Sequence, residues 1–423
     1  MLAHGVSGLC GRRDPLLQMN KKKLLNGVRI LDLSRILAGP WATQLLADYG
    51  AEVIKVERPN QGDDTRNWGP PWKVNQLNNQ GRDAAYFFST NRNKRSLTCD
   101  FSTQEGAAIV KDLVKYCDVV IENFKVGALR KFKLNKQELK KIKPDLIYCS
   151  ITAYAEDSSQ SHQPGYDAMI QASAGLMSIT GEKDGKPQKV GVAIADIMAG
   201  MYAVSAILAS LYQREQNGEI QDINVPLFDS QVSWLANQNM NYLIGGINPA
   251  REGTAHPNIA PYQVFPTKDE DIMLAVGNDN QFERLMECFE EIEENLINKF
   301  NKNSQRVENK EELINFLSER LKMYSASYWL ALFDEKSIPC GPINDIAQVL
   351  NSDYAKEQNL VRYGKNKHNK KIPTVANPIR FSDYDTQYDN AAPTLGEHTN
   401  LILKKLLNYT DEEIKTLKVK NII

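Results

Sequence analysis

The 423-residue chain lacks an excess of charge of either sign, because 51 Lys and Arg residues stand against 52 Asp and Glu. Proteins that bind nucleic acid normally carry a strong basic excess, so this balance argues against a nucleic-acid partner. Long uncharged apolar runs are also missing. The most apolar stretch, residues 197–213, is short and rich in alanine, which is typical of a buried core helix. The sequence therefore predicts a soluble protein with no nucleic-acid and no membrane partner.

The chain also lacks the spacings that bind metals or form disulfide frameworks. Its six cysteines and five histidines are scattered, without a CxxC, CxxH or HExxH pattern. We therefore expect no metal site and a reducing compartment.

Two common enzyme motifs are missing as well. The turn SRILAGPWA stands where a dinucleotide-binding protein has GxGxxG, and no GxSxG elbow of a serine hydrolase occurs. Glu57, at the end of the second apolar run, imitates an acid that binds a ribose, but the adjacent Arg58 suits a phosphate better.

From Val28 onward the chain alternates apolar runs with amphipathic segments. An apolar run, a helix from about Trp41 to Tyr49 and a second apolar run ending at Glu57 form a strand-helix-strand unit. The alternation continues through SLTCDF, TQEGAAIVKDLVKY, CDVVIENF, NKQELKKIK and DLIYCSIT. This order predicts an α/β fold with a Rossmann-like, doubly wound parallel sheet, whose ligands bind beyond the carboxyl ends of the strands.

Changes in composition and in the pattern of apolar residues divide the chain into four parts. The basic leader at 1–23 is either a mitochondrial presequence or a disordered tail, so the predicted location is mitochondrial or otherwise cytoplasmic. A large domain is expected at 24–225 and a smaller inserted α+β domain at 226–349. The part at 350–423 is expected to return to the large domain, so that this domain is built from both termini.

Asp196 is the only charged residue between Gly191 and Arg214. A carboxylate in such an apolar run must be paired, act as a cap or have a chemical role. One interpretation is that Asp196 is the N-cap of a helix from Ile197 to Gln213. The other is a catalytic role, and the two are compatible because helix starts attract anions.

Several ordered segments resemble a known family, the class III CoA-transferases. They are RILDLSRILAGPWATQLLADYGAEVIKVERP, STNRNKRSLTCDF, DVVIENF, PGYDAMIQASAGLMSITG, GVAIADIMAG and LGEHT, and with their spacers they cover nearly all of residues 26–418. The resemblance implies an interlocked homodimer. It also implies CoA thioesters as substrates and no permanently bound cofactor.

The resemblance implies that Asp196 is the nucleophile that attacks an acyl-CoA thioester. An aspartate with an ordinary pKa near 3.9 is already ionised for this task. Asp167, a possible helix cap, and Asp184, in a charged turn, are the competing acids. The backbone around Gly245, Gly246 and Gly253 could donate N–H groups to the anionic intermediates or could simply form turns.

Within the family, NYLIGGINPAREGTAHPNIAPYQVF and CGPIN resemble members that move CoA from succinyl-CoA to a dicarboxylic acid such as glutarate or 3-hydroxy-3-methylglutarate. Leu37 and AHPNIAP replace the Gln and the glycine-rich loop of formyl-CoA transferases, which argues against oxalate. A dicarboxylate needs a cation, and Arg92 and Arg251 are the candidates. The family's CoA site carries over to Leu37, Ala38, Arg58, Cys99, Asp100, Phe101, Ser102 and Asn123.

Two other functions stay open. An alpha-methylacyl-CoA racemase shares the family's fold but needs a His/Asp pair, and no histidine here lies in a matching segment. A catalytically silent CoA-binding protein would not need Asp196.

Overall fold

The computed structural model describes residues 23–74, 82–290, 298–367 and 370–423. Most of the leader predicted at 1–23 therefore lies outside the described residues. The chain forms two compact units. Unit 1 comprises residues up to Ala174, Gly191–Ala236 and Gln358–Ile423, and unit 2 comprises Gly175–Val190 and Asn237–Glu357.

The core of unit 1 is a six-stranded sheet in which every pair of neighbouring strands is parallel. The strand order is β5-β2-β1-β6-β7-β8, which is the 3-2-1-4-5-6 order of a doubly wound fold. The predicted α/β class and parallel sheet are confirmed. The strands are β1 (Arg29–Asp32), β2 (Glu52–Glu57), β5 (Arg95–Thr98), β6 (Val119–Glu122), β7 (Ile147–Thr152) and β8 (Ile223–Pro226).

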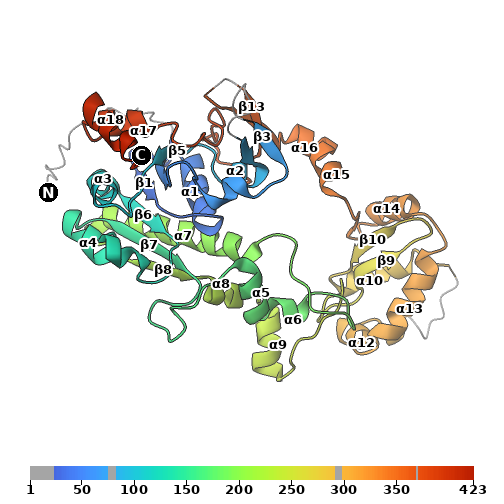
Figure 1. Ribbon diagram of the computed structural model, residues 1–423. Coiled ribbons are helices and arrows are strands. Elements are labelled where there is room, and N and C mark those ends of the chain that lie inside the picture. Colours follow the sequence, from blue (N-terminus) through green and yellow to red (C-terminus); the bar gives the residue numbers. More distant parts are fainter. Residues whose placement is uncertain (1–22, 75–81, 291–297, 368–369) are drawn as a thin grey trace, which may run out of the picture. The chain divides into compact units, whose positions relative to one another are not determined.

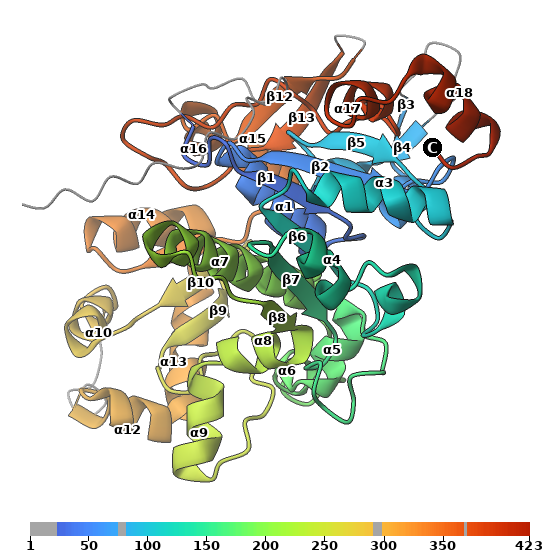
Figure 2. The ribbon, with the colours of Figure 1, turned by 90° about the vertical axis from the view of Figure 1, so that its left-hand side faces the viewer.

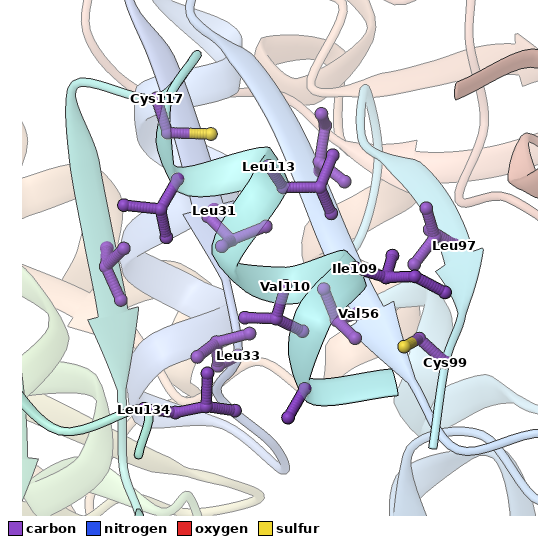
Figure 3. Close-up of a cluster of buried hydrophobic side chains, with 14 of the residues drawn as sticks. Leu31, Leu33, Val56, Leu97, Cys99, Ile109, Val110, Leu113, Cys117 and Leu134 are labelled. Carbon is purple, nitrogen blue, oxygen red and sulfur yellow. The ribbon is translucent and has the colours of Figure 1, made fainter. Parts of the chain in front are cut away.

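Helices cover both faces of this sheet (Figure 2). Alternation along β1 directs Leu31 to one face and Ile30 to the other. Figure 3 shows Leu31 and the neighbouring strand residues turned toward Ile109 and Leu113. The helices are α1 (Ala38–Asp48), α3 (Gln104–Val114), α4 (Lys136–Ile142), α5 (Asp167–Ser173), α7 (Ile194–Asn217), α8 (Leu227–Trp234), α17 (Thr399–Lys405) and α18 (Asp411–Val419).

Helix α7 is longer than the predicted helix from Ile197 to Gln213 and ends at the left-handed Gly218. Among the described residues it alone is long and apolar enough to cross a membrane by length and composition. Its buried apolar residues belong to the same cluster as those of α1 and the sheet, and 39% of its most apolar window is buried.

The chain returns to unit 1 after Glu357, and α17 packs against β5. The predicted domain boundaries at 225/226 and 349/350 stay a prediction. The two compact units change over at other positions, which include 236/237 and 357/358. The remaining elements of unit 1 are η1 (Asp64–Asn67), β3 (Trp72–Val74), β4 (Arg82–Ala84), α2 (Ala85–Phe88), η2 (Ala128–Phe132), β12 (Val361–Lys365) and β13 (Lys371–Val375).

Unit 2 is built around a small antiparallel sheet with the strand order β11-β10-β9, of which Figure 1 labels β9 and β10. Its core contains Phe265, Phe282, Trp329 and Phe333. Its elements are α6 (Leu176–Ile179), α9 (Asn237–Gly245), β9 (Tyr262–Pro266), β10 (Asp271–Ala275), α10 (Asp279–Met286), α12 (Asn303–Glu308), α13 (Lys310–Leu321), α14 (Ala326–Glu335), β11 (Cys340–Pro342), α15 (Ile346–Asn351) and α16 (Asp353–Glu357).

Candidate active site

The strand order of unit 1 reverses between β1 and β6, which is the point where ligands bind in open α/β sheets. A cavity of about 170 Å³ lies beyond the carboxyl ends of these strands. The loops after β1, β6 and β7 line it together with the first turn of α7. Its lining residues include Arg35, Ile36, Leu37, Ala38, Asn123, Phe124, Thr152, Tyr166 and Asp196.

Asp196 lies inside the first turn of α7, whose N-cap is Ala193. The interpretation of Asp196 as the N-cap is therefore wrong. The capping bond comes from Asp167, whose Oδ1 accepts a hydrogen bond from the backbone N–H of Ala195 at 2.8 Å. Gln171 Nε2 donates to the other oxygen of Asp167 at 2.7 Å. Asp167 thus satisfies the helix terminus and leaves Asp196 available for chemistry.

The carboxylate of Asp196 makes no hydrogen bond or ion pair with any described residue. Burial, with a smaller contribution from the charge of Asp167, raises the pKa of Asp196 to about 7. The expectation of an ordinary, fully ionised carboxylate is therefore wrong, because burial disfavours the charged form and no cation pairs with it. A titratable group with such a pKa beside a cavity is typical of a catalytic site.

Gly200 explains how Asp196 reaches the cavity. It lies four residues after Asp196 and therefore on the same face of α7. A Cβ atom at Gly200 would lie 2.7 Å from the carbonyl oxygen of Ala38, so only glycine permits this approach of α7 to the start of α1. The GVAIADIMAG segment thus combines the acid with the glycine that places it.

The start of α1 presents unpaired donors to the same cavity. The backbone N–H groups of Leu37 and Ala38 have no hydrogen-bond partner among the described residues. Leu37 and Ala38 both line the cavity with Asp196. Free N–H groups at a helix N-terminus attract anions, so this turn can stabilise negative charge next to the carboxylate.

A second, smaller cavity lies next to the first, and the two share Arg35 and Phe124 as lining residues. Arg58 and Phe101, both predicted to bind CoA, line the second cavity. The rings of Phe101 and Phe124 pack edge to face with their centroids 5.9 Å apart. The structure therefore divides these predicted residues between two neighbouring cavities.

Arg35 is a site residue that the sequence reasoning missed. Its Nη1 donates to Asp64 Oδ2 at 3.0 Å, and its guanidinium carbon lies 5.2 Å from the centre of the Phe124 ring. The rest of the guanidinium group makes no hydrogen bond to described residues, and 31% of the side chain is exposed. The sequence feature that could have identified Arg35 is its position in the turn after the first strand, where ligands were expected.

Four other predicted CoA residues have protein partners of their own. The side chain of Cys99 lies in the buried apolar cluster (Figure 3), and its thiol donates to the Gly106 carbonyl. The carboxylate of Asp100 accepts hydrogen bonds from the N–H and hydroxyl of Ser102. The Asn123 amide bonds the backbone of Arg35 at both N–H and carbonyl, at 2.8 and 2.7 Å. Asn123 therefore supports the turn, whereas the other three line neither cavity.

Arg92 is almost fully buried, at 5% exposure, and pairs with Asp48 through two hydrogen bonds. Its Nη1 also donates to the Thr374 hydroxyl and the Val375 carbonyl, at 3.2 and 3.1 Å. These contacts involve all three guanidinium nitrogens, so the geometry favours a structural role. The sequence could not predict this, because these partners are remote in the chain.

The other predicted residues lie in unit 2. The Nη1 of Arg251 donates to the Ser178 carbonyl at 3.3 Å, while its buried Nε has no partner among the described residues.

The N–H groups of Gly246 and Gly253 are already bonded to the Tyr242 and Gly181 carbonyls. As they stand, these two N–H groups are not free to bind an anion. Gly245 lies at the end of α9, and Asp184 is exposed in a turn.

Known proteins resemble this chain over nearly its whole length. The profile of CoA-transferase family III matches residues 25–399. A succinate-glutarate CoA-transferase from Agrobacterium fabrum is 44% identical, with 92% of this chain and 96% of that protein aligned. A succinyl-CoA:glutarate CoA-transferase from mouse is 41% identical over 100% of this chain and 98% of its own.

A crystal structure of a CAIB/BAIF family protein from Brucella suis has a similar fold. It superposes with a TM-score of 0.79 at 44% sequence identity and covers 91% of this chain and 100% of its own.

Proposed function

Because the chain belongs to CoA-transferase family III, a family of enzymes that transfer CoA, we propose that it moves CoA from succinyl-CoA to glutarate or a 3-substituted glutarate. The observation that carries the proposal is Asp196. It is an unpaired, partly buried carboxylate in a cavity at the switch point of the sheet. The names of the relatives from Agrobacterium fabrum and mouse support this choice of donor and acceptor.

The proposed reaction proceeds in four exchanges at Asp196. Its carboxylate attacks the thioester carbonyl of succinyl-CoA, which forms a mixed anhydride and releases the CoA thiolate. The thiolate attacks the aspartyl carbonyl, giving an aspartyl-CoA thioester and free succinate. Glutarate then attacks this thioester to form a second anhydride, and the released thiolate attacks the glutaryl carbonyl. Glutaryl-CoA leaves and the Asp196 carboxylate is restored, so no ATP is consumed.

Each exchange passes through an intermediate with a negatively charged oxygen. We assign its stabilisation to the free N–H groups of Leu37 and Ala38, two residues that line the same cavity as Asp196. This assignment replaces Gly246 and Gly253, whose N–H groups are bonded within unit 2.

The second cavity, at about 20 Å³, has room for little more than one water molecule, so we place the phosphates of CoA on the exposed surface beside it. Arg58 and Arg35 line it with guanidinium groups that are not enclosed by protein acceptors. Phe101 and Phe124 add apolar surface between the two cavities. CoA carries several negative charges at its phosphates, and arginine binds phosphate in a bidentate manner.

For the distal carboxylate of the acceptor, we propose Arg251 ahead of Arg92. Arg251 has a buried Nε without a protein partner, whereas Arg92 already pairs with Asp48. A buried unpaired donor is rare in proteins, and a ligand carboxylate would satisfy it.

None of the histidines that the structure describes lines the Asp196 cavity, which supports the transferase over the racemase. We further propose that the enzyme acts as a homodimer, with the leader as a mitochondrial presequence. The side chains of Leu243 and Ile244 are 70% and 81% exposed in this single chain. Exposed apolar side chains of this kind often mark a protein interface, which supports the proposed dimer. The molecular mass in solution tests the dimer. The N-terminal residue of the mature protein, isolated from its own host, tests whether the leader is cleaved as a presequence.

A panel of acceptor acids tests the proposed function. Purified protein is incubated with succinyl-CoA and glutarate, 3-hydroxy-3-methylglutarate, adipate, malate or butyrate, and the new CoA thioesters are measured by mass spectrometry. We expect glutaryl-CoA with the wild type and none with Asp196→Asn. Butyrate should be a far poorer acceptor, because it lacks the distal carboxylate. Equal use of butyrate and glutarate would contradict the proposed substrate class.

A further inference from the structure

Ile36 adopts a left-handed backbone conformation, with φ of 70°, in the turn between β1 and α1. This conformation is unfavourable for any residue with a Cβ atom and most of all for a β-branched one. Such a conformation persists only when surrounding contacts enforce it, and it often occurs at functional sites. The contacts that enforce this one lie in the loop after β2.

Asp63 holds the strained residue directly. Both oxygens of its carboxylate accept from the backbone N–H of Ile36, each at 3.2 Å. Asp63 is buried and paired with the Lys55 ammonium at 2.8 Å. Lys55 also donates to the carbonyl oxygen of Ser34 at 2.9 Å, so the pair contacts the turn at two points.

The two residues that follow Ile36 are Leu37 and Ala38, which line the Asp196 cavity and whose N–H groups have no partner among the described residues. A change in the backbone angles at Ile36 would redirect these N–H groups, because the left-handed residue sets the direction of the chain into α1. Asn123 holds Arg35 on the other side of Ile36, so the turn has little freedom to compensate.

We propose that Asp63 is a positioning residue, which keeps Ile36 left-handed and thereby aims the Leu37 and Ala38 N–H groups at the reacting carbonyl. The inference rests on the proposed function, because it assigns these donors to the intermediates of CoA transfer. Asp63 itself does not line the Asp196 cavity and acts through the turn.

A purely structural role for Asp63 predicts a different outcome. Asp63 also accepts from the N–H of Thr65 at 3.0 Å and so caps the short helix η1. If capping and the Lys55 pair were its whole contribution, loss of Asp63 would lower stability, and a change at Ile36 would not restore activity.

The test is rescue by glycine, which adopts a left-handed conformation without strain. Asp63→Ala and Asp63→Glu are each made alone and together with Ile36→Gly. The Glu variant keeps the negative charge that Lys55 needs, should Asp63→Ala fail to fold. We expect either Asp63 substitution to lower kcat by about a hundredfold and to change the KM for glutarate by less than about threefold.

Ile36→Gly alone is the reference for each double variant, because Ile36 lines the Asp196 cavity and glycine keeps the left-handed conformation without enforcement. Combined with either Asp63 substitution, it should recover at least about tenfold in kcat while the midpoint of thermal unfolding stays lowered. The matched control is Asn60→Gly, because Asn60 is another left-handed residue, with φ of 63°, in the loop that carries Asp63.

Failure of Ile36→Gly to restore kcat, or equal rescue by Asn60→Gly, would overturn the inference. These two outcomes bear on the inference only if the wild-type protein transfers CoA. A wild type that transfers no CoA to any acid would instead contradict the proposed function, so the two failures are distinguishable.

Discussion

The carboxylate of Asp167 accepts a hydrogen bond from the backbone N–H of Ala195, the residue immediately before Asp196. Two acids therefore meet at the N-terminus of α7, Asp167 from α5 and Asp196 from α7 itself, and their surroundings differ. Asp167 has two protein donors, whereas Asp196 has none among the described residues and faces the cavity. One acid stabilises the helix, and the other remains available as a nucleophile.

This arrangement predicts how activity depends on pH. Asp196 must be ionised to attack, and burial with the charge of Asp167 raises its pKa to about 7. The kcat/KM for succinyl-CoA should therefore rise with pH and level off above an apparent pKa near 7. Asp167→Asn removes a negative charge beside Asp196 and should shift the profile to lower pH.

The control for this shift is Asp184→Asn, because Asp184 is exposed in a turn of unit 2. It should leave the pH profile of the wild type unchanged. An unshifted profile in Asp167→Asn would show that the charge of Asp167 does not act on the nucleophile.

Asp196 should also lower the stability of the fold above neutral pH. Its pKa of about 7 in the folded chain exceeds the ordinary value, so the folded state binds the proton more tightly. Unfolding free energy is therefore lost as pH rises from about 4 to 7, by roughly 2 to 4 kcal/mol from about 1.4 kcal/mol per pKa unit. Asp196→Asn should raise Tm, and by more at pH 8 than at pH 5. An equal or lower Tm at pH 8 would contradict this account.

Arg35→Met should weaken binding of CoA through its phosphates. We expect about a tenfold or greater loss in kcat/KM for succinyl-CoA, because a hydrogen bond to a charged group contributes about 1.5 to 3 kcal/mol. Succinyl-pantetheine carries no phosphate, so the same variant should use it as well as wild type does. The control is Arg284→Met, since Arg284 donates to carbonyl groups within unit 2. An equal loss with both substrates would assign Arg35 to the acyl or pantetheine part.

Arg92→Met and Arg251→Met should have different effects. Loss of Arg92 leaves the buried Asp48 without its ion-pair partner, which typically costs about 3 to 5 kcal/mol of stability. This variant should lower Tm and keep the preference for dicarboxylates over butyrate. Arg251→Met should weaken that preference with a small change in Tm. The reverse pattern, measured with the acceptor panel, would restore the assignment of Arg92 to the substrate.

The alternation of strands and helices was readable in the sequence because it arises from local periodicity. The second strand ends at Glu57 as predicted, and the sheet edge that carries the ligand loops follows from the parallel order. Asp196 could be singled out as well, because one carboxylate in an apolar run requires an explanation.

The partners of the predicted residues were not readable, because they come from distant parts of the chain. Asp167 precedes Ala195 by 28 residues, and Arg92 lies 44 residues from Asp48. The interpretation of Asp196 as the N-cap rested on the preference of aspartate for that position, whereas a tertiary contact from Asp167 supplies the capping bond. Apart from its position in the turn after the first strand, nothing in the sequence distinguished Arg35, whose guanidinium lies beside the Phe124 ring only in the folded chain.

The most direct test of Asp196 as the nucleophile is mass spectrometry of the protein after incubation with succinyl-CoA and no acceptor. The account predicts CoA bound as a thioester to the Asp196 side chain in the wild type and in Asp167→Asn, released by hydroxylamine and missing from Asp196→Asn. Transfer activity that persists in Asp196→Asn, or CoA found on Asp167 in place of Asp196, would contradict it.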